Sequence, residues 1–364
     1  MKQRKILFIS HCFPMNNDDM RGIFFSNIIK KIIQSGAEVG VLSPIWDGVS
    51  KLDWDAEDFT FNLKRPFLSE KQHILSKMIT LILFYIKIIA VMILHHQQIK
   101  KYDHIVFCWG FPSGILALFF KSTRHKTIWW LGTDYYLMRK LLNIYFLILG
   151  KGVNHASCSL SISKELERIT GTQISHFPID YAKKDTSEHS VPKEYSDVVD
   201  CVAIGRLEPI KQFDDLIRCF SKLDPKKYQL KIIGDGMQYR ELELLAECSP
   251  NISLLGRLSR QDTLQQLSKS DYLLVCSKHE GLPTVFFEGL DVGTPCISVA
   301  VGDIAHLSHA HPQTCYIMKT LCMREIMNGC EVLGGSDRKS FEKSRDTILK
   351  EYDSMKTVEA LLDF

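Results

Sequence analysis

The chain lacks several features that would place its 364 residues in a familiar class. Its formal net charge is only +3, so overall charge favours neither nucleic acid nor an acidic partner. It has eleven cysteines but no C-x-x-C pair, which leaves zinc and redox motifs without support. Most of these cysteines, including Cys108, Cys201, Cys276 and Cys296, lie in apolar segments. We interpret them as buried free thiols in a reducing compartment.

The sequence also lacks a signal peptide pattern, a dinucleotide-binding turn and repeats. The first residues, MKQRKILFIS, contain no long apolar core and no small-residue cleavage site, so we expect no signal peptide. The G-x-G-x-x-G turn of a dinucleotide-dependent oxidoreductase is missing after the first predicted strand, where residues 10–13 read SHCF. There is no short repeat and no low-complexity tract. A hydrophobic content of 45% and a charged content of 24% are typical of a globular protein, and the length allows two domains.

Two series of short apolar runs alternate with helical patterns and predict two parallel sheets. The polar segment 181–197, YAKKDTSEHSVPKEYSD, separates the series and is the best linker. We therefore expect an α/β protein with two Rossmann-like, doubly wound domains, at 1–180 and 198–335, followed by one or two helices at 336–364. The predicted strands are 5–10, 38–43, 104–109, 127–131, 155–160 and 174–177 in the first domain, and 198–204, 229–233, 252–255, 271–277 and 296–301 in the second.

The stretch 271–303 combines a strand, a glycine-bearing turn, a helix and a second strand. Pro283 fits the first position of the helix, and Gly293 ends it. Glu280 lies before the helix and Glu288 near its second turn, so both carboxylates can face the carboxyl end of the strand. The free N–H groups of the helix start offer a phosphate partial positive charge. This combination suits a sugar nucleotide.

A second polar loop follows the first strand of the second domain, at GRLEPIKQ (205–212). Gly205 frees the backbone at the strand end. Arg206 can bind a diphosphate with a forked pair of donors, and Lys211 adds a point charge. Taken alone, the loop could equally be a solvated surface turn.

The two segments together resemble the retaining glycosyltransferases of family four, which have the two-domain GT-B fold. The resemblance covers Glu280-x7-Glu288 within EGLPTVFFEGLDVGTPCIS, and the G-R-L-x-x-x-K pattern that ends at Lys211. It extends to FP…RGIFFSNIIKKIIQSGAEVGVLSP, FCWGFPSGILALF and WWLGTD in the first domain. It implies that the donor binds in a cleft between the domains, and that the terminal helix crosses back onto the first domain.

The resemblance also implies individual roles. Arg206 and Lys211 hold the donor diphosphate and stabilise it as it leaves, Glu280 supports the transferred sugar, and Glu288 holds the ribose hydroxyls. Glu280, Arg206 and Lys211 are therefore the expected catalytic residues. The remaining donor-binding residues are expected to act through backbone or pocket shape: Gly205, Gly234, Gly256, Leu258, Gly281, Leu282, Pro283, Thr284 and Val285.

The first domain matches the family less completely. Gly22 stands in its glycine loop, where many members carry two glycines. Gly132 and Asp134 match its G-[ST]-D segment, but Leu131 replaces the histidine that many members place before the glycine. We expect His11, Gly22, Gly132 and Asp134 on the acceptor side. A structural hydrogen bond is the alternative for His11 and Asp134.

Residues 51–70 read as polar and irregular. They hold Asp53-Trp54-Asp55, which has the D-x-D spacing of a metal motif but no strand before it, so we expect no metal site and no cofactor. Residues 74–94 predict a long apolar helix. It either packs on the first sheet or lies on an anionic membrane, with the lysines of residues 71–101 near the headgroups.

The expected function is a metal-independent, retaining hexosyltransferase. It would use a UDP- or GDP-sugar and act on a saccharide or a polyprenyl-linked saccharide in bacterial surface polysaccharide biosynthesis. The expected location is the cytoplasm, with the inner membrane surface as a further site. A non-catalytic sugar-nucleotide-binding subunit of the same fold is the alternative.

Overall fold

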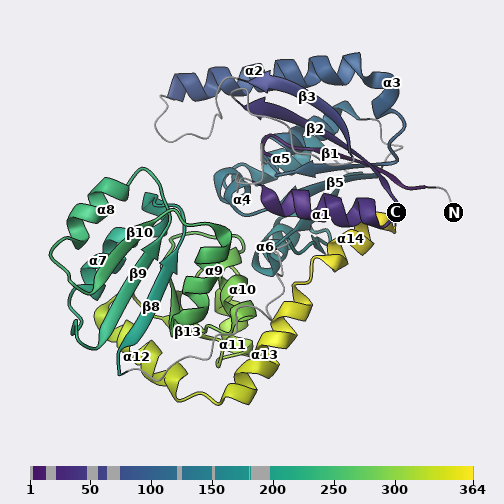
Figure 1. Cartoon of the computed structure of the whole chain (residues 1–364). Coiled ribbons are helices and arrows are strands. Elements are labelled where there is room, and N and C mark those ends of the chain that lie inside the picture. Colours follow the sequence, from purple (N-terminus) through teal and green to yellow (C-terminus); the bar gives the residue numbers. More distant parts are fainter. Residues whose placement is uncertain are drawn as a thin grey trace. The chain divides into compact units, whose positions relative to one another are not determined.

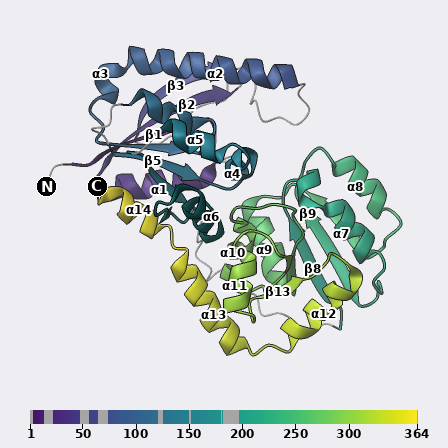
Figure 2. The same ribbon diagram turned by 180° about the vertical axis from the view of Figure 1, so that it is seen from behind.

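The computed structural model describes residues 3–13, 22–46, 56–63, 74–120, 125–149, 152–179, 181 and 197–363. The chain divides into two compact units. The first contains residues 1–180 and 353–364, and the second contains residues 181–352. Each unit is built on a parallel sheet with helices on its faces (Figures 1 and 2). The D-x-D acids at 53 and 55, and residues 182–196 of the predicted linker, lie outside the described residues.

The sheet of the first unit changes direction at its centre. Its strand order is β3-β2-β1-β4-β5-β6-β7, so the chain moves outward from β1 to β3 and returns to the other side of β1 at β4. Both β1 and β4 are apolar and almost fully buried, as expected for strands covered on two faces. The strands are β1 (Lys5–Ile9), β2 (Glu38–Trp46), β3 (Glu57–Leu63), β4 (His104–Cys108), β5 (His125–Trp130), β6 (Asn154–Ser157) and β7 (Ser175–His176).

Helices cover both faces of this sheet, and Figures 1 and 2 show α1 and α5 on opposite faces. Phe84 and Ile88 of α2 are buried in the same apolar cluster as residues of η1 and α5. The predicted packing of helix 74–94 on the first sheet is therefore confirmed. The helices are α1 (Ile23–Gln34), α2 (Ile74–Leu94), α3 (His96–Ile99), η1 (Ser113–Phe119), α4 (Thr133–Met138), α5 (Leu142–Leu149), α6 (Leu160–Thr170) and α14 (Met355–Leu362).

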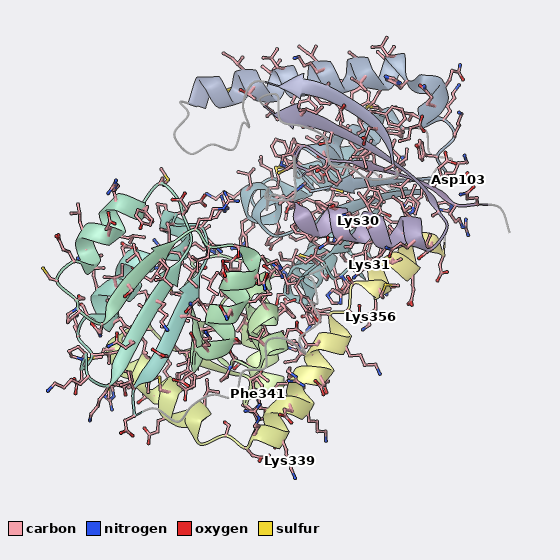
Figure 3. The ribbon with its side chains drawn as sticks, viewed as in Figure 1. Lys30, Lys31, Asp103, Lys339, Phe341 and Lys356 are labelled. Atoms are coloured by element: carbon pink, nitrogen blue, oxygen red, sulfur yellow. The ribbon has the colours of Figure 1, made fainter. Side chains whose placement is uncertain are left out.

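The last helix, α14, packs beside α1, near the start of the chain. Lys31 Nζ donates a hydrogen bond to Ser354 Oγ at 2.8 Å, and Thr357 Oγ1 donates to the Pro178 carbonyl at 2.8 Å. Figure 3 labels Lys31 on α1 and Lys356 on α14, on these neighbouring helices. The end of the chain is thus part of the first unit.

The second unit repeats the same plan in the order β10-β9-β8-β11-β12-β13, with its change of direction between β8 and β11. Its strands are β8 (Val199–Ile204), β9 (Tyr228–Ile233), β10 (Ile252–Gly256), β11 (Tyr272–Val275), β12 (Cys296–Val299) and β13 (Cys315–Met318). Its helices are η3 (Pro209–Lys211), α7 (Phe213–Phe220), α8 (Tyr239–Ala246), α9 (Arg260–Lys269), α10 (Thr284–Val292), α11 (Ile304–Ala310), α12 (Met323–Gly334) and α13 (Arg338–Glu351).

The predicted α/β class with two parallel sheets is confirmed, but two edge strands were missed. The assignment of residues 51–70 as irregular was wrong at β3, where the buried Phe59 and Phe61 alternate with more exposed residues. The strand β13 was also absent from the prediction. β3 alternates buried and more exposed residues and so lacks the continuous apolar run of a central strand, whereas β13 is a run of only four residues, CYIM. The helix α10 begins one residue later than expected, with Pro283 as its N-cap, and ends at Gly293 as predicted.

Glycine at 234 lets the loops after β8 and β9 touch. Gly234 has φ +146°, and a Cβ placed there would lie 1.8 Å from the Gly205 carbonyl oxygen. Two backbone hydrogen bonds hold the loops at this distance, from Leu207 N to Asp235 O and from Gln238 N to Leu207 O, both 3.0 Å. No side chain fits at 234 unless the loop after β8 moves.

This contact predicts that Gly234→Ala destabilises the second unit more than Gly293→Ala does. Gly293 also has a positive φ, +86°, but nothing lies within 4 Å of its added Cβ. The control should therefore lose only the backbone term, about 1 to 2 kcal/mol. Differential scanning calorimetry measures both variants, and equal losses would contradict the close contact.

Candidate functional site

The loops after β8 and β11 are joined at the change of direction in the second sheet. Lys278 N donates to the Ile210 carbonyl at 2.8 Å, and Cys276 Sγ donates to the Lys211 carbonyl at 3.0 Å. Open α/β sheets bind ligands at such a point, because the adjacent loops there diverge. The two predicted motifs are therefore neighbours here, although Lys211 and Glu280 are 69 positions apart in the sequence.

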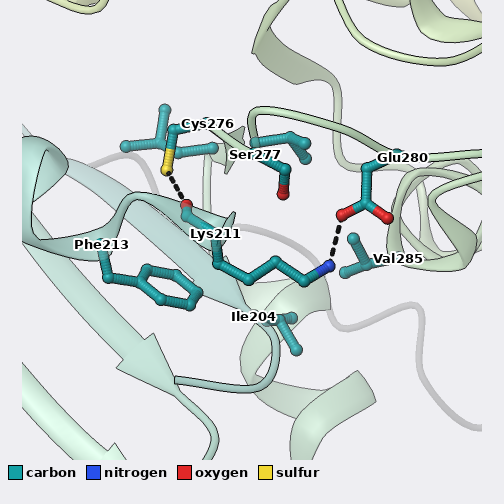
Figure 4. Close-up of a pocket in the computed structure, with 9 residues that line it drawn as sticks. Ile204, Lys211, Phe213, Cys276, Ser277, Glu280 and Val285 are labelled. Carbon is teal, nitrogen blue, oxygen red and sulfur yellow. Dashed lines mark hydrogen bonds and ion pairs between the residues drawn. The ribbon is translucent and has the colours of Figure 1, made fainter. Parts of the chain in front are cut away.

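An ion pair between Lys211 and Glu280 lines a small pocket between these loops (Figure 4). Their side chains are 22% and 16% exposed, so the pair is partly shielded from water and still reachable. Charges in such a position interact more strongly than they do on an open surface. The pocket is lined by Ile204, Lys211, Phe213, Leu274, Val275, Cys276, Ser277, Glu280 and Val285.

Arg206 is not part of this pocket. Its guanidinium forms an ion pair with Glu208, and its side chain is 74% exposed. Arg206 and Lys211 were expected to bind the same diphosphate, but in this structure their side chains do not lie in the same pocket. Because the Arg206 side chain is long and mostly solvated, little packing opposes a change of its rotamer.

Glu288 lies on α10 and is paired with Arg260 of α9. Arg260 Nη1 donates to Glu288 Oε1 at 3.0 Å, and Arg260 Nη2 donates to the Tyr181 carbonyl at 2.8 Å. Burial raises the pKa of Glu288 above its ordinary value, and the charge of Arg260 opposes this shift. The sequence did not point to Arg260, because the pair depends on how α9 and α10 pack.

The segment from Gly281 to Val285 leads into α10 as expected. Gly281, Leu282 and Pro283 are buried, and Thr284 and Val285 form the first turn of the helix, where N–H groups have no acceptor within the helix. Gly302, which the sequence did not single out, packs beneath this segment. A Cβ at Gly302 would lie 2.6 Å from the Gly281 carbonyl oxygen, so the glycine permits the approach.

The other predicted donor-side residues follow the strands β8, β9 and β10. Gly205 follows β8 and touches Gly234, as described above. Gly234 N donates to the Gly256 carbonyl at 2.9 Å, and this hydrogen bond joins the end of β9 to the end of β10. Leu258 is half-buried two residues beyond β10. These residues shape the backbone at the strand ends and contribute no charge.

The corresponding change of direction in the first unit lies between β1 and β4. His11 follows β1, Trp109 follows β4, and their ring centroids are 5.3 Å apart. Burial lowers the pKa of His11 to about 3, so its imidazole is neutral at pH 7. Gly22 lies before α1 in a left-handed conformation and is buried.

Asp134 is buried and makes structural hydrogen bonds. Its carboxylate accepts the N–H groups of Leu131 at 3.0 Å and Gly132 at 2.9 Å, together with that of Gly110. Burial raises the pKa of Asp134 to about 6 in spite of these bonds. The side chain thus fixes the turns after β4 and β5, which is the structural role left open by the sequence. Leu131, which precedes Gly132, is buried as well.

Part of the second unit is similar in sequence to a known family. Residues 199–322 match the family described as glycosyl transferases group 1. Over 106 residues the chain is 31% identical to an uncharacterized glycosyltransferase of Methanocaldococcus jannaschii. The alignment covers 29% of this chain and 29% of that relative, so the chain spans under a third of the relative's length. Residues 199–322, which match the family, contain Lys211, Glu280 and Glu288.

Solved structures extend the likeness to the whole chain. The sucrose-phosphate synthase of Thermosynechococcus elongatus has a TM-score of 0.72 at 13% identity and covers 99% of this chain and 97% of its own. Anabaena HepE in complex with UDP and glucose has a TM-score of 0.66 at 14% identity and covers 99% of both chains. The lipopolysaccharide outer core galactosyltransferase WaaB has a TM-score of 0.62 at 16% identity and covers 97% and 98%. These likenesses show the GT-B fold, with two Rossmann-like domains.

The low pKa of His11 predicts acid sensitivity of the first unit. The unfolded chain takes up a proton at this histidine as the pH falls below about 6.5, whereas the folded chain does not until about pH 3. The stabilising effect of His11 is complete above pH 6.5. It is lost as the pH falls, by about 1.4 kcal/mol per pH unit.

His11→Asn should therefore flatten the fall in stability between pH 7 and pH 5. The exposed His309 of the second unit provides a control, His309→Asn, which should leave the fall unchanged. All five tryptophans belong to the first unit, so their fluorescence during urea unfolding follows that unit alone. An unchanged slope in His11→Asn would contradict the buried, neutral state of His11.

Proposed function

We propose that the chain is a glycosyltransferase that moves a hexose from a nucleotide-diphosphate sugar, with a UDP- or GDP-linked donor, to the hydroxyl of a saccharide or a polyprenyl-linked saccharide. One observation carries this proposal. A partly shielded lysine–carboxylate pair lies in a pocket where the second sheet changes direction, inside the residues that match group 1 glycosyl transferases. Sheets of this kind bind nucleotides at that position.

The pair suggests how a donor would be held. Glu280 holds the ammonium group of Lys211 beside the pocket that both residues line. A diphosphate carries more negative charge than one carboxylate and would attract Lys211 away from Glu280. Arg206 would turn from Glu208 to the same phosphates. The two cations would stabilise the negative charge that develops as the diphosphate leaves.

In this proposal the two carboxylates bind the sugar and the ribose of the donor. Glu280, released from Lys211, would accept hydrogen bonds from the hydroxyls of the transferred sugar, and the reaction would retain the anomeric configuration. Glu288, held by Arg260, would accept hydrogen bonds from the ribose hydroxyls. The N–H groups of Thr284 and Val285 would face a phosphate. Gly205, Gly234, Gly256 and Leu258 would shape the nucleotide side.

The proposed setting is the cytoplasmic face of a bacterial membrane, in the synthesis of surface polysaccharide. The first unit would bind the acceptor near His11, Gly22 and Gly132, and Asp134 would support that region through the backbone. Residues 74–101, which include α2 and α3, would contact anionic lipid. The exposed apolar side chains of α2 support this contact.

A sugar-nucleotide-binding subunit without turnover is the second candidate, and Leu131 in place of the family histidine favours it. Donor turnover separates the two candidates. An enzyme should release free nucleoside diphosphate from its donor, slowly by hydrolysis and faster when an acceptor is added. Tight binding of UDP or GDP with no release from any donor or acceptor would favour the binding subunit.

Lys211→Ala should weaken binding of the preferred nucleoside diphosphate by about 10- to 100-fold. That range corresponds to the loss of one charge-assisted hydrogen bond to phosphate. The control Lys226→Ala, at an exposed position, has the same net charge as Lys211→Ala. It should bind the nucleotide as the native chain does. Isothermal titration calorimetry with UDP and GDP measures both variants, and equal affinity would remove Lys211 from the diphosphate site.

Glu288→Gln should weaken binding of the same nucleoside diphosphate by about tenfold but leave the binding of inorganic pyrophosphate unchanged. Glutamine keeps the shape of the side chain but loses the charge that makes glutamate a strong acceptor for ribose hydroxyls. Competition between pyrophosphate and the nucleotide in the same calorimeter gives both constants. A variant that loses both ligands equally would show that Glu288 acts on the phosphates or on folding, and not on ribose.

A further inference from the structure

The outer surface of the first unit carries large apolar side chains on three neighbouring elements. Besides α2, the end of η1 and the segment from α4 to α5 expose such residues, and Leu147 is 82% exposed. The exposed set is Met78, Ile79, Ile82, Leu83, Ile86, Ile93 and Leu94 of α2, Leu118 and Phe119 of η1, and Leu137, Leu141, Ile144, Leu147 and Ile148 of α4–α5. A monomer rarely exposes so much apolar surface without a use for it.

These elements lie over one face of the first sheet. Phe84 of α2, Leu116 of η1 and Tyr145 of α5 are buried in a single apolar cluster. Tyr85 Oη of α2 also donates to the Pro112 carbonyl, directly before η1, at 2.9 Å. Since their inner sides share one core, their outer sides form the surface layer of one face. We call this layer, made of the exposed residues above, the apolar face.

The elements that carry the apolar face contain few acids, and the adjacent helix α6 carries two acids and two basic residues. From Lys71 to Lys164 the sequence holds only two acids, Asp103, which is half-buried, and Asp134, which is buried. The exposed basic residues Lys87, Arg139 and Lys140 lie among the apolar ones. No helix in the described ranges has both the length and the apolar character to cross a bilayer.

We propose that α4–α5 is a second membrane-docking element, and that it lays the apolar face on an anionic lipid bilayer together with α2. Aliphatic side chains enter the boundary between headgroups and acyl chains, and the basic side chains meet the lipid phosphates. A second copy of the chain fits less well, because within residues 71–164 no exposed acid is available to pair with Arg139 and Lys140 of the other copy. The proposal extends the proposed contact of α2 and rests on the same bilayer.

Vesicle flotation of the full chain tests this assignment. The native chain should float with vesicles of phosphatidylglycerol and phosphatidylcholine, and much less with phosphatidylcholine alone. Leu147→Glu/Ile148→Glu, in α5, should reduce binding to the anionic vesicles by about tenfold or more. Both side chains are exposed, so the fold should tolerate the change, and nucleoside diphosphate binding by the second unit serves as the check.

A matched control and a charge variant sharpen the test. Leu244→Glu, at a 70% exposed position on α8 of the second unit, should float as the native chain does. Arg139→Glu/Lys140→Glu should also lose binding, with the largest effect at low salt.

Three results would overturn the proposal. Native binding by the α5 variant, with loss of binding in Ile86→Glu/Ile93→Glu of α2, would leave α2 as the sole docking element. Absence of native binding to either vesicle would remove the membrane contact altogether while leaving nucleotide binding untouched. A native dimer that dissociates in Leu147→Glu/Ile148→Glu, measured by analytical ultracentrifugation, would show that a second copy covers the apolar face.

Discussion

The ion pair between Lys211 and Glu280 is the interaction on which the candidate site depends. It exists because β8 and β11 are neighbours in the second sheet while their loops belong to motifs far apart in the chain. The backbone hydrogen bond between Lys278 and Ile210 fixes the distance between the loops, so that a lysine and a glutamate side chain can meet. A donor diphosphate would compete for a lysine that is already held in place, so little side-chain entropy remains to be lost on binding.

Close backbone contacts hold the rest of the site. Gly234 touches the loop after β8, and Gly302 supports the peptide after Glu280. Arg260 joins Glu288 to the backbone at Tyr181, the first residue of the second unit. Tyr181 also stacks on Phe287 of α10, with ring centroids 5.4 Å apart. The helix that carries Glu288 is therefore tied to the start of its unit by both a polar and an aromatic contact.

The loops of the site could be predicted from the sequence, but the pairing of their side chains could not. A glycine, a forked cation and a lysine follow one strand, and an acid precedes the helix that follows another. These residues single out the two loops, because ligand loops follow parallel strands. Which acid pairs with which base depends on neighbouring helices. Lys211 forms an ion pair with Glu280, Arg206 with Glu208, and Arg260 with Glu288. The apolar character of α2 was also evident from the sequence, whereas the exposure of α4–α5 was not, since buried and exposed leucines look alike there.

A crystal structure of the chain with bound UDP or GDP would test the central claim most directly. The account predicts the nucleotide at the carboxyl ends of β8 and β11, with Lys211 Nζ within hydrogen-bond distance of a phosphate oxygen and no longer paired with Glu280. A nucleotide bound elsewhere, or one bound there while Lys211 keeps its contact with Glu280, would contradict it.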